Sequence, residues 1–357
     1  MENPLKFWAL LLQILVEHVY STNAEHQPRR IFNGGRAMQA TPYGPRKPSF
    51  KPFAHKGGPP DVEGVWTGDR YIGLLPPGDG FASTVYLEDG TFQQQMGRYL
   101  SWECTNESGV YIATAIRADT YSNGTIEYRQ RCEVGKVDLA EGVYYWKSSA
   151  DECPSIDSSD FNNPLTRVKD TTSFPGTFTL YCNGNAGAGF TNVGEAGLDA
   201  IRTDGVFTGP PLPPPLDPNA SFPPKFAQPS GPKDISGIWY SDESRTGELI
   251  DSDGSFSSVA LLPDGTFMTV LGLFNSNNCT GPAMYSGSIT YTQTYQDLKR
   301  VSSDGCTSGA VDLEAQTYTW SSANGPRNCP NENSIKFTFY RAGTSEALPT
   351  PASYACS

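Results

Sequence analysis

Short runs of β-branched and aromatic residues, separated by turn residues, recur along the chain from residue 61 onward. Residues 111–116, 178–180, 289–292 and 337–339 are rich in Ile, Thr, Tyr and Phe, which favours strands. No window shows the periodicity of a long amphipathic helix. The pattern therefore predicts an all-β fold.

Two tight turns interrupt the apolar runs. Asp89-Gly90 lies between residues 85–87 and Phe92, and Asp264-Gly265 lies between residues 259–262 and 267–273. An Asp-Gly pair between two apolar runs is the strongest short hairpin signal. We expect an antiparallel hairpin at each position.

An internal repeat organises these elements, because residues 61–182 and 234–356 follow one pattern. Gly64-Val65-Trp66 returns as Gly237-Ile238-Trp239, and each Asp-Gly turn continues with Thr-Phe. About six to eight short strands in each copy are typical of a sandwich or an up-and-down barrel. The sequence predicts two tandem homologous antiparallel domains, each a β-barrel, half-barrel or sandwich, at 61–182 and 234–356.

Eight cysteines fall into this repeat, four in each copy, with spacings of 28, 21 and 29 residues against 27, 23 and 27. An even count in a chain with an export signal predicts a disulfide framework with two bonds in each copy. Three pairings remain open for each copy. The cysteines are Cys104, Cys132, Cys153, Cys182, Cys279, Cys306, Cys329 and Cys356.

The segments outside the repeat have their own compositions. Residues 1–24 contain the apolar run 7–16, which has the length of a signal-peptide core. Residues 25–60 are basic and rich in Pro and Gly, as in a disordered arm. Residues 183–233 become dense in proline, which favours a semi-rigid linker. We expect a secreted, extracellular protein without a transmembrane anchor.

Charge and sequons agree with that compartment. The formal charge is −12, and residues 61–357 hold 18 Lys/Arg against 35 Asp/Glu, so a nucleic-acid partner is not expected. Four N-x-S/T sequons predict a glycoprotein. They lie at Asn106, Asn123, Asn219 and Asn278.

Residue supply limits the chemistry within the repeat. All three histidines precede residue 61, which excludes nucleophile–His–acid catalysis and histidine-rich zinc sites in the domains. We expect no metal site, no cofactor and no catalytic residue. A carboxylate-based hydrolase needs only two acids, but the acids shared by both copies fit turn and capping roles better. These are Asp61/Asp234, Asp89/Asp264 and Asp138/Asp312.

Aromatic residues recur at equivalent places in the two copies and are the candidate ligand-binding residues. Large aromatic side chains line apolar cavities, although they also fill cores. The candidates are Trp66, Tyr144, Trp146, Trp239, Tyr318 and Trp320.

Two resemblances extend this interpretation. Gly64-Val65-Trp66 and Gly237-Ile238-Trp239 resemble the Gly-x-Trp motif that opens the first strand of lipocalins. The chain also resembles the tandem lipocalin-like domains of the adenomatosis-polyposis-coli down-regulated family of Wnt antagonists. That resemblance rests on residues 237–239, 264–267 and 278–282 and, more loosely, on 64–66 and 90–92.

The second resemblance implies binding of a lipid or a lipidated extracellular protein in barrel cavities. The leading expectation is thus a secreted, non-enzymatic binding protein for an apolar ligand or lipid-modified partner. The alternative is a matrix or interaction glycoprotein without a ligand cavity, and a carboxylate-based hydrolase is the third reading. The sequence leaves open the ligand, the oligomeric state and which copy carries the function.

Overall fold

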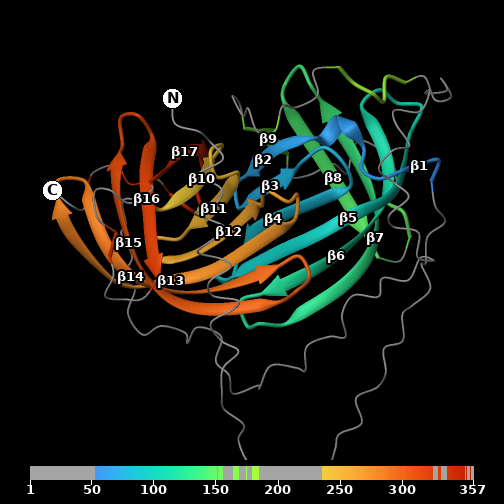
Figure 1. Ribbon diagram of the computed structural model, residues 1–357. Helices are drawn as coiled ribbons and strands as arrows, with labels where there is room; N and C mark the ends of the chain where they lie inside the picture. The colour runs from blue at the N-terminus through green and yellow to red at the C-terminus, as the bar shows by residue number, and fades with distance from the viewer. Residues whose placement is uncertain are drawn as a thin grey trace, which may run out of the picture. The chain divides into compact units, whose positions relative to one another are not determined.

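The computed structural model describes residues 53–150, 152–155, 164–168, 174, 179–184, 235–324, 329–330, 336–349, 351 and 354. These residues form two antiparallel β-barrels, each closed by eight strands (Figure 1). The predicted all-β fold with two tandem barrel domains is confirmed. The predicted signal peptide and residues 185–233 of the linker lie outside the described residues.

Barrel 1 is built from eight strands that follow one another around the barrel. β5 closes the ring by pairing with both β4 and β6, and β9 joins β8 to β2. The strands are β2 (Gly64–Gly68), β3 (Tyr71–Leu75), β4 (Gly80–Tyr86), β5 (Phe92–Cys104), β6 (Val110–Tyr121), β7 (Ile126–Asp138), β8 (Val143–Ser149) and β9 (Leu165–Arg167).

Barrel 2 repeats this order, with each strand paired to the next and β17 paired back to β10. Its strands are β10 (Gly237–Ser241), β11 (Thr246–Ile250), β12 (Ser255–Leu261), β13 (Phe267–Gly281), β14 (Met284–Tyr295), β15 (Arg300–Asp312), β16 (Thr317–Asn324) and β17 (Phe337–Gly343).

The eighth strand of barrel 1 lies at a different place from the predicted one. Residues 165–167 form β9, whereas Thr179 and Leu180 are not in a strand and Phe178 lies outside the described residues. The prediction of a strand at 178–180 was wrong, because the apolar side chain in this segment packs against the core without joining the sheet. Leu180 packs beside the core of barrel 1 next to Cys182.

Two short elements precede β2. The strand β1 (His55–Lys56) pairs with β5, and a 3₁₀ turn, η1 (Pro60–Val62), follows it. Ordered structure therefore begins before residue 61, inside the range assigned to the basic arm.

Both predicted hairpins are present, between β4 and β5 and between β12 and β13. Gly90 and Gly265 have positive φ angles of 79° and 83°, which a turn requires and glycine adopts at little cost. The preceding aspartate accepts bonds from the backbone N–H and the hydroxyl of the threonine two residues later, at 2.6–3.0 Å in both copies. The turn role expected for Asp89 and Asp264 is confirmed.

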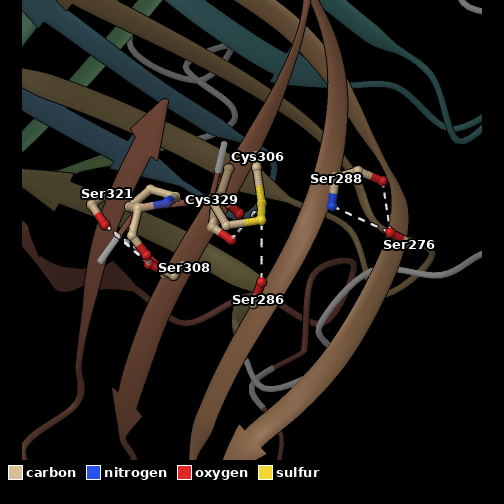
Figure 2. Close-up of a disulfide and its surroundings, with 9 residues drawn as sticks. Ser276, Ser286, Ser288, Cys306, Ser308, Ser321 and Cys329 are labelled. Atoms are coloured by element: carbon tan, nitrogen blue, oxygen red, sulfur yellow. Dashed lines mark hydrogen bonds between the residues drawn. A yellow bond between two sulfur atoms is a disulfide. The ribbon is translucent and has the colours of Figure 1, made fainter. Parts of the chain in front are cut away.

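Three disulfides join described cysteines: Cys104–Cys182, Cys132–Cys153 and Cys306–Cys329. In the first copy the pairing is first to fourth and second to third. Cys279 is disulfide-bonded as well. Figure 2 shows Cys306–Cys329 beside hydroxyl pairs on neighbouring strands, Ser276 with Ser288 and Ser308 with Ser321. Cys132–Cys153 and Cys306–Cys329 tie the segments that follow β8 and β16 to β7 and β15, and Cys104–Cys182 ties the segment after β9 to the end of β5.

Strands β2–β5, β10–β12 and the first half of β13 are buried or half-buried on both faces, whereas the end of β13 is exposed. Trp66 and Tyr144 belong to the core inside barrel 1, whereas Val65 and Ile72 belong to a cluster that also contains Ile238 and Leu249 of barrel 2. Residues alternate between the faces of a strand. One face of these strands lines a lumen and the other contacts the second barrel, which is why they show little polar alternation.

The two barrels therefore share an apolar core, within the compact unit Pro45–Ser357. β3 contacts β11 and β4 contacts β12, so equivalent strands meet. A buried polar network lies in this contact: Ser257 accepts hydrogen bonds from Thr84 at 2.7 Å and from Gln94 at 2.9 Å, and Gln94 also donates to the Val270 carbonyl at 2.7 Å. The paired polar groups fix the register of the contact.

Candidate functional site

Inside barrel 1, Glu133 on β7 is 7% exposed and accepts three hydrogen bonds from tyrosine hydroxyls. Tyr99 donates at 3.0 Å, and Tyr111 and Tyr144 each donate at 2.7 Å. Burial, followed by the charge of Glu133, raises the pKa of all three tyrosines well above 10. The three hydroxyls stay protonated and stabilise the carboxylate.

The backbone opposite this cluster is glycine for a steric reason. Tyr111 faces Gly135 across the β6–β7 pair, and a Cβ on Gly135 would lie 2.3 Å from the Tyr111 ring. Gly309 and Tyr285 repeat the arrangement in barrel 2, with a Cβ 2.6 Å from the tyrosine oxygen. Each tyrosine lies flat over a glycine and reaches the lumen.

A second polar cluster lies on the same two strands. Asp119 on β6 is fully buried, with Oδ1 2.9 Å from Arg117 Nε and Oδ2 3.5 Å from Arg129 Nε. Burial raises the pKa of Asp119, although the guanidinium groups of Arg117, Arg129 and Arg131 lower it in part. Glu127 also pairs with Arg129. A third arginine, Arg131, lies two residues from Arg129 and therefore on the same face of β7.

A cavity of about 30 Å³ lies between the two clusters. Its walls include the rings of Tyr71, Phe81 and Trp146, and its polar lining includes Arg117, Arg131 and Glu133. This volume holds about two water molecules or one small polar group.

Barrel 2 has the same tyrosine pair but a different carboxylate. Tyr318 on β16 donates to Glu248 on β11. The buried Tyr285 hydroxyl has no hydrogen-bond partner among the described residues. Burial raises the pKa of Glu248 to about 7, although the bond from Tyr318 lowers it. The cavity here, about 10 Å³, is smaller and is lined mainly by Ile, Phe and Trp.

The strand registers identify equivalent positions. Cys132 pairs with Ser149 as Cys306 pairs with Ala323, so Glu133 corresponds to Thr307. By the same logic Gly73 on β3 corresponds to Glu248 on β11. The two copies thus supply a carboxylate to the shared tyrosine pair from different strands.

The predicted ligand-binding residues fall into two groups. Tyr144 and Trp146 line the cavity of barrel 1, and Tyr318 and Trp320 line that of barrel 2. Trp66 and Trp239 are fully buried instead.

These two tryptophans are held in the same way. The indole N–H groups donate to the carbonyls of Val62 and Ile235, at 2.7 and 2.8 Å. A guanidinium lies over each ring, Arg167 at 5.8 Å and Arg341 at 4.2 Å. Both tryptophans are part of the core, and whether the other four bind a ligand stays a prediction.

Sequence reasoning missed the inward-facing charges Arg117, Asp119, Arg129, Arg131 and Glu133. Their spacing of two residues along each strand was a signal, since it places them on one face. The other face of these strands mixes buried, half-buried and exposed residues, so no clear alternation was visible. Comparison of the copies was the better signal, because copy 2 has Tyr291, Gln293, Ser303, Gly305 and Thr307 at these positions.

Other predicted positions have simple roles. Asp138 and Asp312 accept hydrogen bonds from turn amides at 2.8–3.1 Å, and Asp61 accepts from Tyr181 and Cys182 at 2.5 and 2.8 Å. Asn106, Asn123 and Asn278 are exposed; Asn219 and Asp234 lie outside the described residues. In the described ranges no group of His, Cys, Asp and Glu is arranged to hold a metal. No helix there has the length and apolar character needed to span a bilayer.

Comparison with models of protein families, with curated proteins and with solved structures finds no match for this chain.

Proposed function

We propose that this chain is a secreted, non-enzymatic binding protein in which barrel 1 holds a small organic ligand and barrel 2 is its structural partner. The supporting observation is the difference between the two lumens. Barrel 1 keeps a cavity of about 30 Å³ with both aromatic and polar walls, whereas barrel 2 keeps about 10 Å³. Ligand pockets combine apolar walls with a few convergent polar groups in this way.

We attribute part of the difference to one pair of equivalent residues. Ala115 lines the cavity in barrel 1 and pairs with Arg131, and Ile289 lines the cavity in barrel 2 and pairs with Gly305. The larger isoleucine fills space that alanine leaves open. The same fold therefore tolerates a filled lumen, so the cavity in barrel 1 is not a requirement of the barrel.

The cavity volume bears on ligand size. A long acyl chain, as expected from the resemblance to lipid-binding barrels, needs far more room than 30 Å³. It would enter only if the half-buried rings of Tyr71, Phe81 and Trp146 moved aside. The geometry supports a small ligand, or the head group of a larger one, better than an enclosed lipid.

The test is native mass spectrometry of the protein purified from the medium of a eukaryotic secretory host. We expect a bound mass that disappears on denaturation and is absent from Ala115→Ile, which gives barrel 1 the residue that fills barrel 2. The control is Ile289→Ala, which enlarges only the lumen of barrel 2 and should keep the bound mass. Equal native and denatured masses, after glycans and disulfides are counted, would contradict the proposal.

Binding of a partner through the outer surface is the second candidate. It is supported by barrel 2, whose lumen has almost no free volume, and by Tyr340 on β17, which is 56% exposed. This function predicts that Ala115→Ile leaves partner binding unchanged while Tyr340→Ser weakens it.

A further inference from the structure

Three arginines crowd into the lumen of barrel 1 from two adjacent strands. Arg117 on β6 pairs in register with Arg129 on β7, and Arg131 pairs with the adjacent inward residue, Ala115. Like charges on neighbouring positions of one face repel each other. Their placement therefore needs compensating negative charge.

Carboxylates among the described residues form ion pairs with two of the three arginines. Asp119 pairs with Arg117 and Arg129, and Glu127 adds a second carboxylate to Arg129. Arg131 has no ion pair or hydrogen bond among the described residues, and its Nε is buried without a partner. Burial, together with Arg117 and Arg129, lowers the pKa of Arg131. The charge of Asp119 attracts Arg131 and raises its pKa in part, but Arg131 has no direct ion pair in its partly desolvated position, which is costly.

The fold does not require these charges. Barrel 2 has Tyr291, Ser303 and Gly305 where barrel 1 has Arg117, Arg129 and Arg131. The position of Asp119 is taken by Gln293. The same strands close without any charge at these four positions, so the arginines of barrel 1 have a role other than closure.

Arg131 and Arg117 both line the cavity, together with Gln95 and Ser148. Glu133, two residues from Arg131 on the same face of β7, already accepts hydrogen bonds from three tyrosine hydroxyls. An anionic ligand group would therefore lie beside Arg117 and Arg131, the cationic residues that line the cavity. The protein as a whole carries a formal charge of −12, so an anion gains nothing from the surface in general and depends on this local site.

We propose that the cavity of barrel 1 binds the carboxylate of a small organic acid, with Arg131 as the principal donor and Arg117 as the second. This inference rests on the proposed function and names its ligand class. A guanidinium offers a planar fork of N–H donors that matches a carboxylate, which is small enough for a volume of about 30 Å³. A short aliphatic part would lie against the half-buried rings of Tyr71, Phe81 and Trp146 and displace them.

The test uses two small probes of nearly the same shape, butyrate and the neutral butyramide. Each is titrated into the ¹⁵N-labelled full chain, and the indole N–H of Trp146 reports binding by its chemical shift. We expect butyrate to bind about tenfold more tightly or better, since a hydrogen bond to a charged group contributes about 1.5–3 kcal/mol.

Variants separate the role of the charge from that of the fold. Arg131→Gln should remove the preference for butyrate, and Arg131→Lys should keep part of it because the charge remains. Lys299→Gln removes an exposed cation from barrel 2 and should bind both probes like the parent chain. Unchanged backbone spectra of the Arg131 variants show that they are folded.

The outcomes distinguish the two proposals. If butyramide binds as tightly as butyrate, and Ala115→Ile weakens both, barrel 1 is a ligand site but the carboxylate inference is overturned. If Arg131→Gln keeps the preference for butyrate, the assignment to Arg131 is overturned. If neither probe shifts Trp146 in the parent chain, the carboxylate inference fails, and native mass spectrometry decides the proposed function separately.

Discussion

Two glutamates lie inside the barrels, and each accepts a hydrogen bond from a tyrosine at an equivalent position. Glu133 receives three such bonds, whereas Glu248 receives one, from Tyr318. Fewer donors mean less compensation for the cost of placing a charge in a lumen. Glu248, in the barrel with the smaller cavity, accordingly has its pKa raised to about 7.

Glu248 makes stability depend on pH. Its pKa is about 7 in the folded protein against an ordinary 4.5, so between these values the folded state holds a proton that the unfolded state has lost. Stability should fall as pH rises from about 4.5 to about 7 and then level off. Glu248→Gln, which keeps a polar group for Tyr318, should abolish this loss and be about 1–3 kcal/mol more stable than the parent chain above pH 7.

Urea unfolding between pH 4 and 8 measures that difference. Glu243→Gln is the control, because Glu243 is exposed in the turn between β10 and β11. A difference between Glu248→Gln and the parent chain that stays constant across this pH range would contradict the assignment.

At the scale of elements, both copies pair a tyrosine on one strand with a glycine on the next. The tyrosine ring covers the glycine backbone and so occupies the space of a missing side chain. Both barrels use this pairing on the second of their long strand pairs, β6–β7 and β14–β15. The tyrosine hydroxyl is thereby aimed at the lumen.

Gly135→Ala should destabilise barrel 1 by about 1–3 kcal/mol, because the new methyl group overlaps the Tyr111 ring and displaces its hydroxyl from Glu133. Thermal unfolding measures the loss. Gly281→Ala at the end of β13 is a matched control, since its Cβ would meet only the flexible Met284 side chain at 3.3 Å. Equal effects of the two substitutions would argue against a specific role for the Tyr111–Gly135 pair.

The elements that could be predicted were those with a local signal. Asp-Gly turns and runs of β-branched residues placed the two hairpins and, apart from residues 178–180, the strands that were named from them. β9 was missed because three residues, Leu165 to Arg167, carry no periodicity of their own. Its identity depends on pairing with β2 and β8, which are distant in sequence. The inward charges on β6 and β7 were missed because the opposite face of these strands mixes buried residues such as Ala118 with exposed ones such as Tyr128, so no clear alternation marks the lumen.

At the scale of the whole molecule, the apolar cluster that joins β2–β5 to β10–β13 makes the barrels one folding unit. Sequence analysis found the duplication but not this contact, because residues such as Ile72 and Leu249 are as apolar as any core residue. Nothing in their spacing distinguishes an outward face that meets another barrel from an inward one.

Leu249→Ala should therefore weaken both barrels together, by about 2–5 kcal/mol, since it opens space in the shared cluster. Hydrogen exchange followed by mass spectrometry should show faster exchange in the strands of barrel 1 as well as barrel 2. Two separate unfolding transitions in the parent chain, or an effect confined to barrel 2, would contradict a shared core.

The contact between the barrels brings equivalent strands together, and Ile72 meets Gly247, its counterpart in the second copy. Such self-matching is the geometry of a homodimer. In a true homodimer every substitution appears twice, so a lumen cannot be filled in one subunit and kept open in the other. Covalent fusion removes that restriction. One copy is free to specialise as scaffold while the other keeps a cavity, and the expected stoichiometry is one ligand per chain rather than two.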